Sequence, residues 1–322
     1  MRALVVDTLS EDLSGTALTE VVEPQRGPGQ LLVRVRAASL NYPDLLMTRG
    51  AYQLKPALPF TLGMEMTGDV VEAGADSGFA PGDRVVAGTR LSGFAELVAV
   101  DAGAARRVPD GMSFAQAASV GAAYLTAWVG LVALGRMRAG EWVLVHGATG
   151  GVGLAAVDLA HALDARVIAT SRSPDKLATL KSEYPVEATL PASGFREAVK
   201  ELTGGGADLV FDPVGGDVFD ESTRCIGWGG RLLVIGFTSG RIASVPANIP
   251  LIKGFSVIGV RAGEYGRRDP AAGRAAADAV WRLAAEGRIR PRVHAIYKLA
   301  DWRAAFEAMA AASHIGKLVI EP

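Results

Sequence analysis

Hydrophobic and polar positions are arranged differently in the first hundred residues and in the remainder of the chain. The first part contains short runs rich in β-branched residues, each bounded by Gly, Pro or Asp, and this pattern predicts strands of a small barrel or sheet. The runs cover residues 31–37, 67–73, 83–87 and 95–100. From about Val108 onwards, helical and strand patterns alternate, which indicates βαβ units and a parallel sheet.

The second part predicts a nucleotide-type α/β unit. A helix is expected at 152–163, directly after the first strand of that sheet, and Ser173 and Pro174 supply an N-cap and a first helical residue for the next helix. Two Ala-rich helical stretches follow Asp269. The strands of this unit are expected at residues 142–146, 166–170, 207–212, 231–235 and 256–260. The tail that follows ends in a strand at 317–321, and the pattern assigns it to neither unit.

Composition narrows the class of protein. The length of 322 residues suggests two domains, and 33 basic residues nearly balance 34 acidic ones. A chain without a basic, aromatic-interleaved stripe is not expected to bind nucleic acid. The single cysteine, Cys225, excludes an intramolecular disulfide and a cysteine-rich zinc site, so we expect a cytoplasmic protein.

Residues 117–135 carry no charge and are long enough to span a bilayer. Their Ala, Gly, Ser and Thr content, together with Tyr124 and Trp128, favours a buried helix between two domains instead. We therefore expect no membrane partner.

A glycine-rich turn follows the first strand of the α/β unit and opens its helix. Such a turn lets the backbone approach a pyrophosphate at a helix N-terminus. Ala148 stands where the G-x-G-x-x-G template has its first glycine, and Gly150 and Gly153 match the other two. A tight strand-to-helix turn without a ligand is the alternative. The context favours dinucleotide binding by the turn residues Thr149, Gly150, Gly151, Val152 and Gly153.

The end of the next strand indicates which dinucleotide is bound. NAD-binding chains carry an acidic residue there for the ribose 2′-hydroxyl, whereas this chain has Ser171 and Arg172, with Lys176 one turn later. These groups suit a 2′-phosphate, which a carboxylate would repel. NADPH is therefore the expected cofactor, the alternative being that both cations are solvated surface charges.

These motifs, together with others that follow the order found in one protein family, extend over essentially the whole chain. The sequence resembles the zinc-free quinone oxidoreductase (zeta-crystallin-like) branch of the medium-chain dehydrogenase/reductase superfamily. The further motifs are Asn41-Tyr-Pro-Asp44, Gly50-Ala-Tyr52, Pro59-Phe-Thr-Leu-Gly-Met-Glu-Met-Thr-Gly68, Gly82-Asp-Arg-Val85, Ala123-Tyr-Leu-Thr126, Asp212-Pro-Val-Gly-Gly216 and Gly236-Phe-Thr-Ser-Gly240.

The resemblance implies an α/β protein with a GroES-like, β-rich catalytic domain, residues 1–117 and 259–322, and an inserted Rossmann domain with a doubly wound parallel sheet, residues 118–258. The active site would lie in the cleft. A homodimer paired through the strand near 256–260 is also implied. The residues similar to the family's cofactor contacts are Asn41, Thr126, Val214, Gly236, Phe237, Thr238 and Arg261.

No metal is expected. Zinc-dependent relatives need a Cys near the position of Asn41 and a His after Phe60, where this chain has Leu62-Gly-Met-Glu65. Relatives often carry a C-terminal Arg as a further phosphate contact. Ala312 stands at that position, with Lys317 nearby, so this contact is left open.

The leading interpretation is an NADPH-dependent quinone oxidoreductase that transfers a hydride directly to a small quinone, with Asn41 and Tyr52 in the catalytic site. The alternative is an NADPH-dependent reductase of activated C=C bonds in 2-enoyl thioesters, 2-haloacrylates or enones, with Tyr52 as proton donor. Tyr52 otherwise only lines the pocket, while Arg261 would favour an anionic acceptor. A third hypothesis is an NADPH-responsive binding protein with little turnover.

Overall fold

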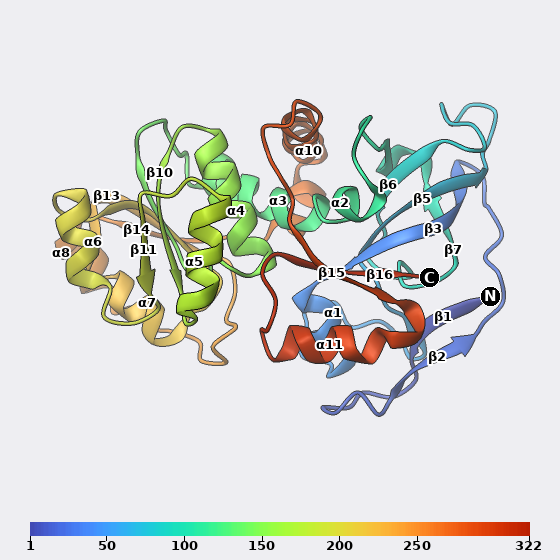
Figure 1. Cartoon of the computed structure of the whole chain (residues 1–322), viewed down its shortest axis with the longest axis horizontal. Coiled ribbons are helices and arrows are strands. Elements are labelled where there is room, and N and C mark those ends of the chain that lie inside the picture. The colour runs from blue at the N-terminus through green and yellow to red at the C-terminus, as the bar shows by residue number, and fades with distance from the viewer. The chain divides into compact units, whose positions relative to one another are not determined.

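The computed structural model describes residues 1–322, which separate into two compact units (Figure 1). The first unit comprises Met1–Ala122 and Pro291–Pro322, and the second comprises Ala123–Arg290. The chain therefore leaves the first unit once and returns to it near its C-terminus.

The first unit is built on two sheets. In the larger sheet the hydrogen-bonded order is β15-β16-β3-β5-β6-β8, with β7 also paired to β3, and a small sheet has the order β2-β1-β4. The strands are β1 (Arg2–Val6), β2 (Thr16–Glu20), β3 (Gln30–Leu40), β4 (Phe60–Thr61), β5 (Glu65–Glu72), β6 (Arg84–Gly88), β7 (Leu97–Asp101), β8 (Ala105–Arg107), β15 (Val293–Lys298) and β16 (Lys317–Glu321).

Two distant parts of the chain meet in the larger sheet. β16 lies antiparallel to β3, with Val319 opposite Ser39, so that the last strand joins a sheet formed mainly by the first hundred residues. The main core of the unit includes Leu40, Met66 and Phe306 and residues of the helices α1 (Tyr42–Thr48) and α11 (Trp302–Ala310). The helix α2 (Phe114–Ala118) packs in a separate small cluster with Ala37 and Val319.

The second unit contains a parallel six-stranded sheet in the order β11-β10-β9-β12-β13-β14. β9 is wholly buried and β12 almost so, as expected for the centre of a parallel sheet covered on both faces. The strands are β9 (Trp142–Val145), β10 (Arg166–Ser171), β11 (Ala188–Pro191), β12 (Ala207–Asp212), β13 (Ile226–Val234) and β14 (Ser256–Gly259), and the helices between them are α4 (Gly151–Ala162), α5 (Pro174–Glu183), α6 (Arg196–Thr203), α7 (Gly216–Ser222) and α8 (Asn248–Lys253).

The fold class and most of the expected elements are confirmed. Ser173 caps α5 by accepting a hydrogen bond from the Lys176 N–H, and Pro174 is its first residue. β1, β2, β4, β8, β11 and β15 were not expected from the pattern. β15 alternates between half-buried and exposed residues without a strong apolar run, which explains why its sequence did not stand out.

The uncharged segment 117–135 is not one helix. It contains the end of α2, then α3 (Gly121–Trp128) and a π-helical turn (Val129–Leu134), and the boundary of the two units falls inside α3. The single buried helix expected here is therefore wrong, because the segment is split after Ser119, the C-cap of α2. No helix of the chain is both long enough and apolar enough to cross a membrane.

The second unit also ends later than the implied boundary at residue 258. Residues 259–290 belong to it, including α9 (Ala262–Arg268) and α10 (Pro270–Ala285). α10 packs on α9, which packs on the π-helical turn. The backbone N–H of Arg290 donates to the Asp158 carboxylate of α4, and the Tyr124 hydroxyl donates to the same oxygen at 2.6 Å.

Candidate functional site

The glycine turn lies at the carboxyl end of β9, next to β12, where the strand order of the sheet reverses direction. Open parallel sheets bind ligands at this position. Gly147 has φ of +54°, and a Cβ on Gly153 would lie 2.2 Å from the Gly147 carbonyl oxygen. A Cβ on Gly150 would meet nothing closer than 3.4 Å. Gly147 and Gly153 therefore shape the turn, whereas Gly150 leaves space above it.

The first backbone N–H groups of α4 are available to a ligand. Gly150 is the N-cap, and the helical hydrogen bonds begin with the Leu154 N–H donating to the Gly150 carbonyl. The N–H groups of Gly151, Val152 and Gly153 thus precede the ladder. Together with the helix dipole they form a site suited to an anion.

The residues that we predicted to bind a 2′-phosphate lie together at the carboxyl end of β10. The Ser171 and Thr149 hydroxyls lie 3.1 Å apart, which joins this strand end to the glycine turn. Arg172 is exposed and Lys176 is half-buried. Partial burial lowers the pKa of Lys176, and the neighbouring Arg172 charge lowers it further. Two cations held this close favour a bound anion.

The loops that follow β12 and β13 belong to the same candidate site in the second unit. Asp212 accepts hydrogen bonds from the Val214 and Gly215 N–H groups, while the Thr238 N–H and hydroxyl both donate to the Pro213 carbonyl. Phe237 is exposed beside Gly236. The second carboxylate oxygen of Asp212 is buried without a partner, and burial raises the pKa of this group.

Beneath these loops a buried histidine links three elements of the second unit. His146 lies 2.8 Å from both the Thr170 and the Ser222 hydroxyls, and burial lowers its pKa to about 3. A neutral imidazole that bonds two hydroxyls has a structural role.

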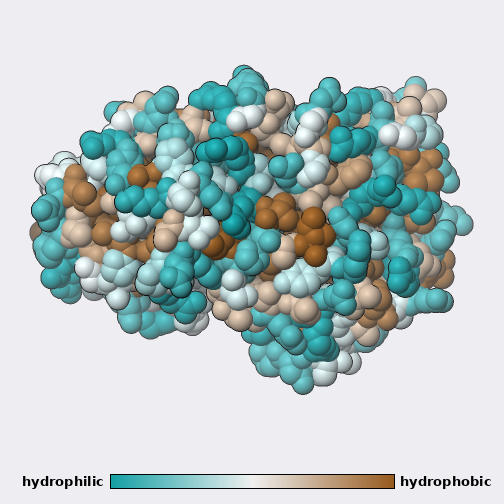
Figure 2. All heavy atoms as spheres, in the orientation of Figure 1, coloured by the Kyte–Doolittle hydropathy of each residue, from teal (hydrophilic) through white to brown (hydrophobic).

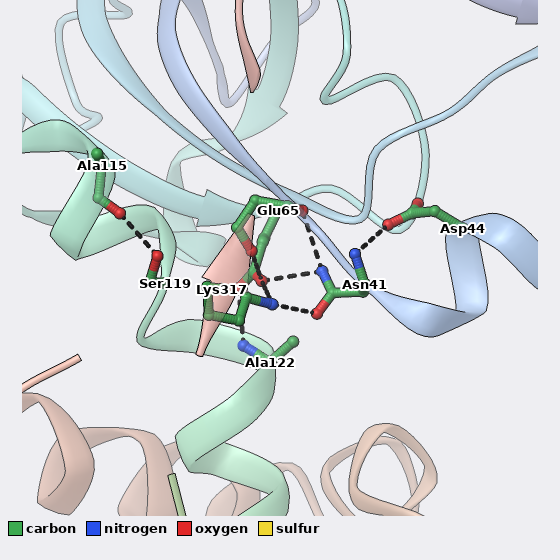
Figure 3. A network of polar contacts seen from close by, with 8 residues as sticks. Asn41, Asp44, Glu65, Ala115, Ser119, Ala122 and Lys317 are labelled. Carbon is green, nitrogen blue, oxygen red and sulfur yellow. Dashed lines mark hydrogen bonds and ion pairs between the residues drawn. The ribbon is translucent and has the colours of Figure 1, made fainter. Parts of the chain in front are cut away.

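In the first unit, Asn41 is the centre of a buried polar network (Figure 3). It is the N-cap of α1, directly after β3. Its side-chain oxygen accepts from the Lys317 ammonium at 2.6 Å, and its side-chain nitrogen donates to Glu65 at 2.9 Å. Glu65 also accepts from the Ser39 hydroxyl and, through its second oxygen, from the Ala122 N–H.

Asp44 supports this network from the first turn of α1. One of its oxygens accepts from the Asn41 N–H at 2.9 Å and the other from the Gly63 N–H at 3.3 Å. Burial raises the pKa of the Asp44 carboxyl to about 7, and the Glu65 carboxylate acts in the same direction. The helix cap is therefore sensitive to pH near neutrality.

The remaining predicted residues are distributed over both units. Tyr52 follows α1 and packs against the core of the first unit, and its hydroxyl has no hydrogen-bond partner in the structure. Thr126 lies on α3 in the second unit, half-buried. Arg261 is the exposed N-cap of α9 and lies 3.8 Å from Glu264, which Arg267 and Arg268 contact more closely.

Two functional candidates, Glu65 and Lys317, were not assigned from the sequence as part of the Asn41 site. Lys317 was considered only as a phosphate contact, but it is buried and bonded to Asn41 and Glu65. A charged residue within an apolar strand is the only local signal for either residue. Their proximity depends on the pairing of β16 with β3 and of β3 with β5.

Family models and individual proteins match this chain. Residues 27–126 match the alcohol dehydrogenase GroES-like domain, and residues 151–280 match the zinc-binding dehydrogenase family. Quinone oxidoreductase-like protein 2 of Mus musculus is 36% identical over 99% of this chain and 91% of its own length.

The chain belongs to the quinone oxidoreductase branch of the medium-chain dehydrogenase/reductase superfamily.

A solved structure and a segment of a larger protein extend this comparison. The quinone oxidoreductase from Thermus thermophilus, described together with its NADPH complex, is 32% identical, with a TM-score of 0.88 and 100% of both chains covered. A mycocerosic acid synthase-like polyketide synthase of Mycobacterium tuberculosis is 34% identical over 92% of this chain but only 14% of its own length. The protein is thus an oxidoreductase of this superfamily.

The raised pKa of Asp44 can be tested through the pH dependence of the protein's stability. Its folded-state value of about 7 lies above the ordinary 3.8, so the folded protein binds more protons between these values. The free energy of unfolding should therefore fall as pH rises from about 5 to 7, by up to about 1.4 kcal/mol per pH unit. Asp44→Asn lacks this contribution, and its difference in stability from the wild type should shrink over that range in urea titrations.

Asp110→Asn removes an exposed carboxylate of the same unit and is the matched control. A stability difference between the wild type and Asp44→Asn that is constant with pH, or that grows as pH rises, would contradict the assignment.

Proposed function

We propose that the protein is an NADPH-dependent quinone oxidoreductase that transfers a hydride to a small quinone without a metal. The observation that carries the proposal is the glycine turn at the carboxyl end of β9, with Ser171, Arg172 and Lys176 at the neighbouring strand end. The turn suits a pyrophosphate, and the two cations suit a ribose 2′-phosphate. The similarity to the Thermus thermophilus enzyme supports the same cofactor.

The chain contributes orientation and electrostatics to this reaction. A bound nicotinamide supplies a hydride from its C4 atom. Val214, Gly236, Phe237 and Thr238 follow the ends of β12 and β13, and we assign them to the surface that holds the ring. Asn41 supplies a fixed amide, and the proton that completes the hydroquinone comes from Tyr52 or water.

Zinc independence is supported by charges in the first unit. No group of three or more His, Cys, Asp or Glu side chains in the structure is arranged to hold a metal ion. The Asn41 amide, at the position near which zinc-dependent relatives need a Cys, instead bonds the Lys317 ammonium. A divalent cation placed beside this ammonium would be repelled.

A second candidate function is the reduction of activated C=C bonds, such as those of 2-enoyl thioesters. The unbonded Tyr52 hydroxyl favours it, because that phenol is available to donate a proton to the carbon next to a carbonyl. The similarity to a segment of a mycocerosic acid synthase-like polyketide synthase also favours it. The exposed Arg261 would attract an anionic acceptor.

We also propose a homodimer paired through β14. This strand bonds β13 on one side and forms the edge of the six-stranded sheet on the other. Hydrophobic side chains reach the surface at the end of the second unit where α8 is drawn (Figures 1 and 2). They include Trp228, which is 83% exposed, with Leu251, Ile252 and Val257. A sheet edge flanked by apolar residues suits a second copy of the same edge.

Cofactor choice is tested by Arg172→Ala. Loss of a charge-assisted hydrogen bond to the 2′-phosphate should raise the KM for NADPH about 10- to 100-fold and leave the KM for NADH nearly unchanged. Steady-state kinetics with both cofactors measures this difference. Arg274→Ala, on an exposed face of α10, is the control. Equal effects on the two cofactors would refute the assignment.

Acceptor choice is tested by following NADPH oxidation with a quinone panel and a 2-enoyl thioester panel. We expect turnover with quinones that Tyr52→Phe changes by less than about 3-fold, since a water can supply the proton. Efficient alkene reduction that falls about 100-fold or more in Tyr52→Phe would establish the second candidate instead. Tyr297→Phe, a half-buried tyrosine of β15, is the control. Tight NADPH binding with no turnover on either panel would indicate a binding protein.

The homodimer is tested by sedimentation equilibrium. The wild type should have twice the chain mass of 33.5 kDa. Trp228→Glu should shift it to the monomer, because a carboxylate would be buried without a partner. Val22→Glu changes an equally exposed apolar residue of the first unit and should leave the dimer intact. A wild-type monomer at micromolar concentration would refute the proposal.

A further inference from the structure

The Asn41 side chain has a single orientation, set by its two charged neighbours. An ammonium carries only donors and a carboxylate only acceptors. The Lys317 ammonium therefore requires the amide oxygen on its side, at 2.6 Å, and Glu65 requires the amide nitrogen on its side, at 2.9 Å (Figure 3). Rotating the amide by half a turn would oppose donor to donor and acceptor to acceptor.

The remaining bonding capacity of Asn41 follows from this orientation. Its nitrogen has two N–H groups, and they donate to Glu65 and to the Ser39 carbonyl at 3.2 Å. Its oxygen has two lone pairs, and Lys317 occupies one of them. The amide can therefore offer a ligand only an acceptor.

We propose that Lys317 is a positioning residue that holds Asn41 as an acceptor, so that this side chain recognises an N–H or O–H donor of its ligand. The inference rests on the proposed function, because we assign this donor to the carboxamide N–H of the nicotinamide that the proposed function requires. Lys317 does not touch the ligand in this scheme; it acts through the direction of the Asn41 amide.

Burial makes the ammonium hard to replace. Lys317 is 6% exposed and Glu65 is 3% exposed, and their side chains lie 3.4 Å apart. Removing the ammonium alone leaves a buried carboxylate without its counter-charge, which is strongly destabilising. It also removes one of the two charged groups that fix the amide, while Glu65 still holds the amide nitrogen. Replacing both charges with neutral groups of similar volume avoids the first effect and removes both constraints on the amide.

The test uses a cofactor that keeps the acceptor and loses the donor. In the 3-acetylpyridine analogue of NADPH, a methyl group replaces the carboxamide nitrogen. The wild type should bind NADPH about 10-fold more tightly than this analogue, as expected for one lost hydrogen bond to a polarised acceptor. In Lys317→Met the amide oxygen loses its charged partner while Glu65 alone holds the amide nitrogen, and the ratio should fall to about 2-fold. Fluorescence titration measures both affinities without any electron acceptor.

Three further variants complete the test. Lys317→Arg retains a cation and should restore at least half of the wild-type preference on a logarithmic scale. The double variant Glu65→Gln, Lys317→Met leaves neither charge of this pair and releases the amide, so it should fold with the preference lost, which covers the case in which Lys317→Met does not fold. Lys298→Met changes an exposed lysine of the neighbouring β15 that pairs with Glu321, and it should behave as the wild type.

The outcomes separate this inference from the proposed function. A roughly 10-fold preference that persists in Lys317→Met or in the double variant overturns the role of Lys317, as does equal binding of the two cofactors by the wild type. The expected pattern without quinone turnover supports Lys317 and refutes only the quinone acceptor. No binding of NADPH by the wild type overturns both.

Discussion

The buried Glu65 carboxylate is the interaction on which the first unit depends. It accepts hydrogen bonds from β3, from the start of α1 and from the start of α3, and it faces the ammonium of β16. A Cβ on Gly121 would lie 2.5 Å from its second oxygen, so the glycine there makes room for it. A buried charge is tolerated only when it is paired and fully hydrogen-bonded. Satisfying this one group therefore requires four segments of the chain to be in place together.

The second unit positions its ligand groups by a different means. Its anion-binding groups are backbone N–H groups and the residues at strand ends, which a parallel sheet aligns at one edge. Little side-chain chemistry is needed beyond the Asp212 carboxylate, which holds its loop through two N–H groups. The first unit, in contrast, holds its key amide through charged side chains that come from opposite ends of the chain.

This difference explains which parts of the site could be predicted. The glycine turn, Ser171 and Arg172 could be proposed as cofactor-binding residues because a strand, a turn and a helix that are consecutive in sequence carry a recognisable pattern. The network of Asn41, Glu65 and Lys317 could not be predicted in this way. Asn41 and Lys317 are 276 residues apart, and the sequence around either residue does not indicate that the other lies nearby. The end of the second unit also lies later than the resemblance implied, since nothing in the sequences of α9 and α10 identifies the unit on which they pack.

The sequence by itself determined the fold class, the dinucleotide-type turn and the positions of most strands along the chain, because hydrophobic periodicity, capping residues and glycine positions act over a few neighbouring residues. Only the tertiary structure decided which direction the Asn41 amide faces and that the pKa of the Asp44 carboxyl lies near neutrality. Both depend on charges that meet through sheet pairing and on their removal from water. Asp44 has the same neighbours in sequence whether exposed or buried, and it is mainly burial that raises its pKa from 3.8 to about 7.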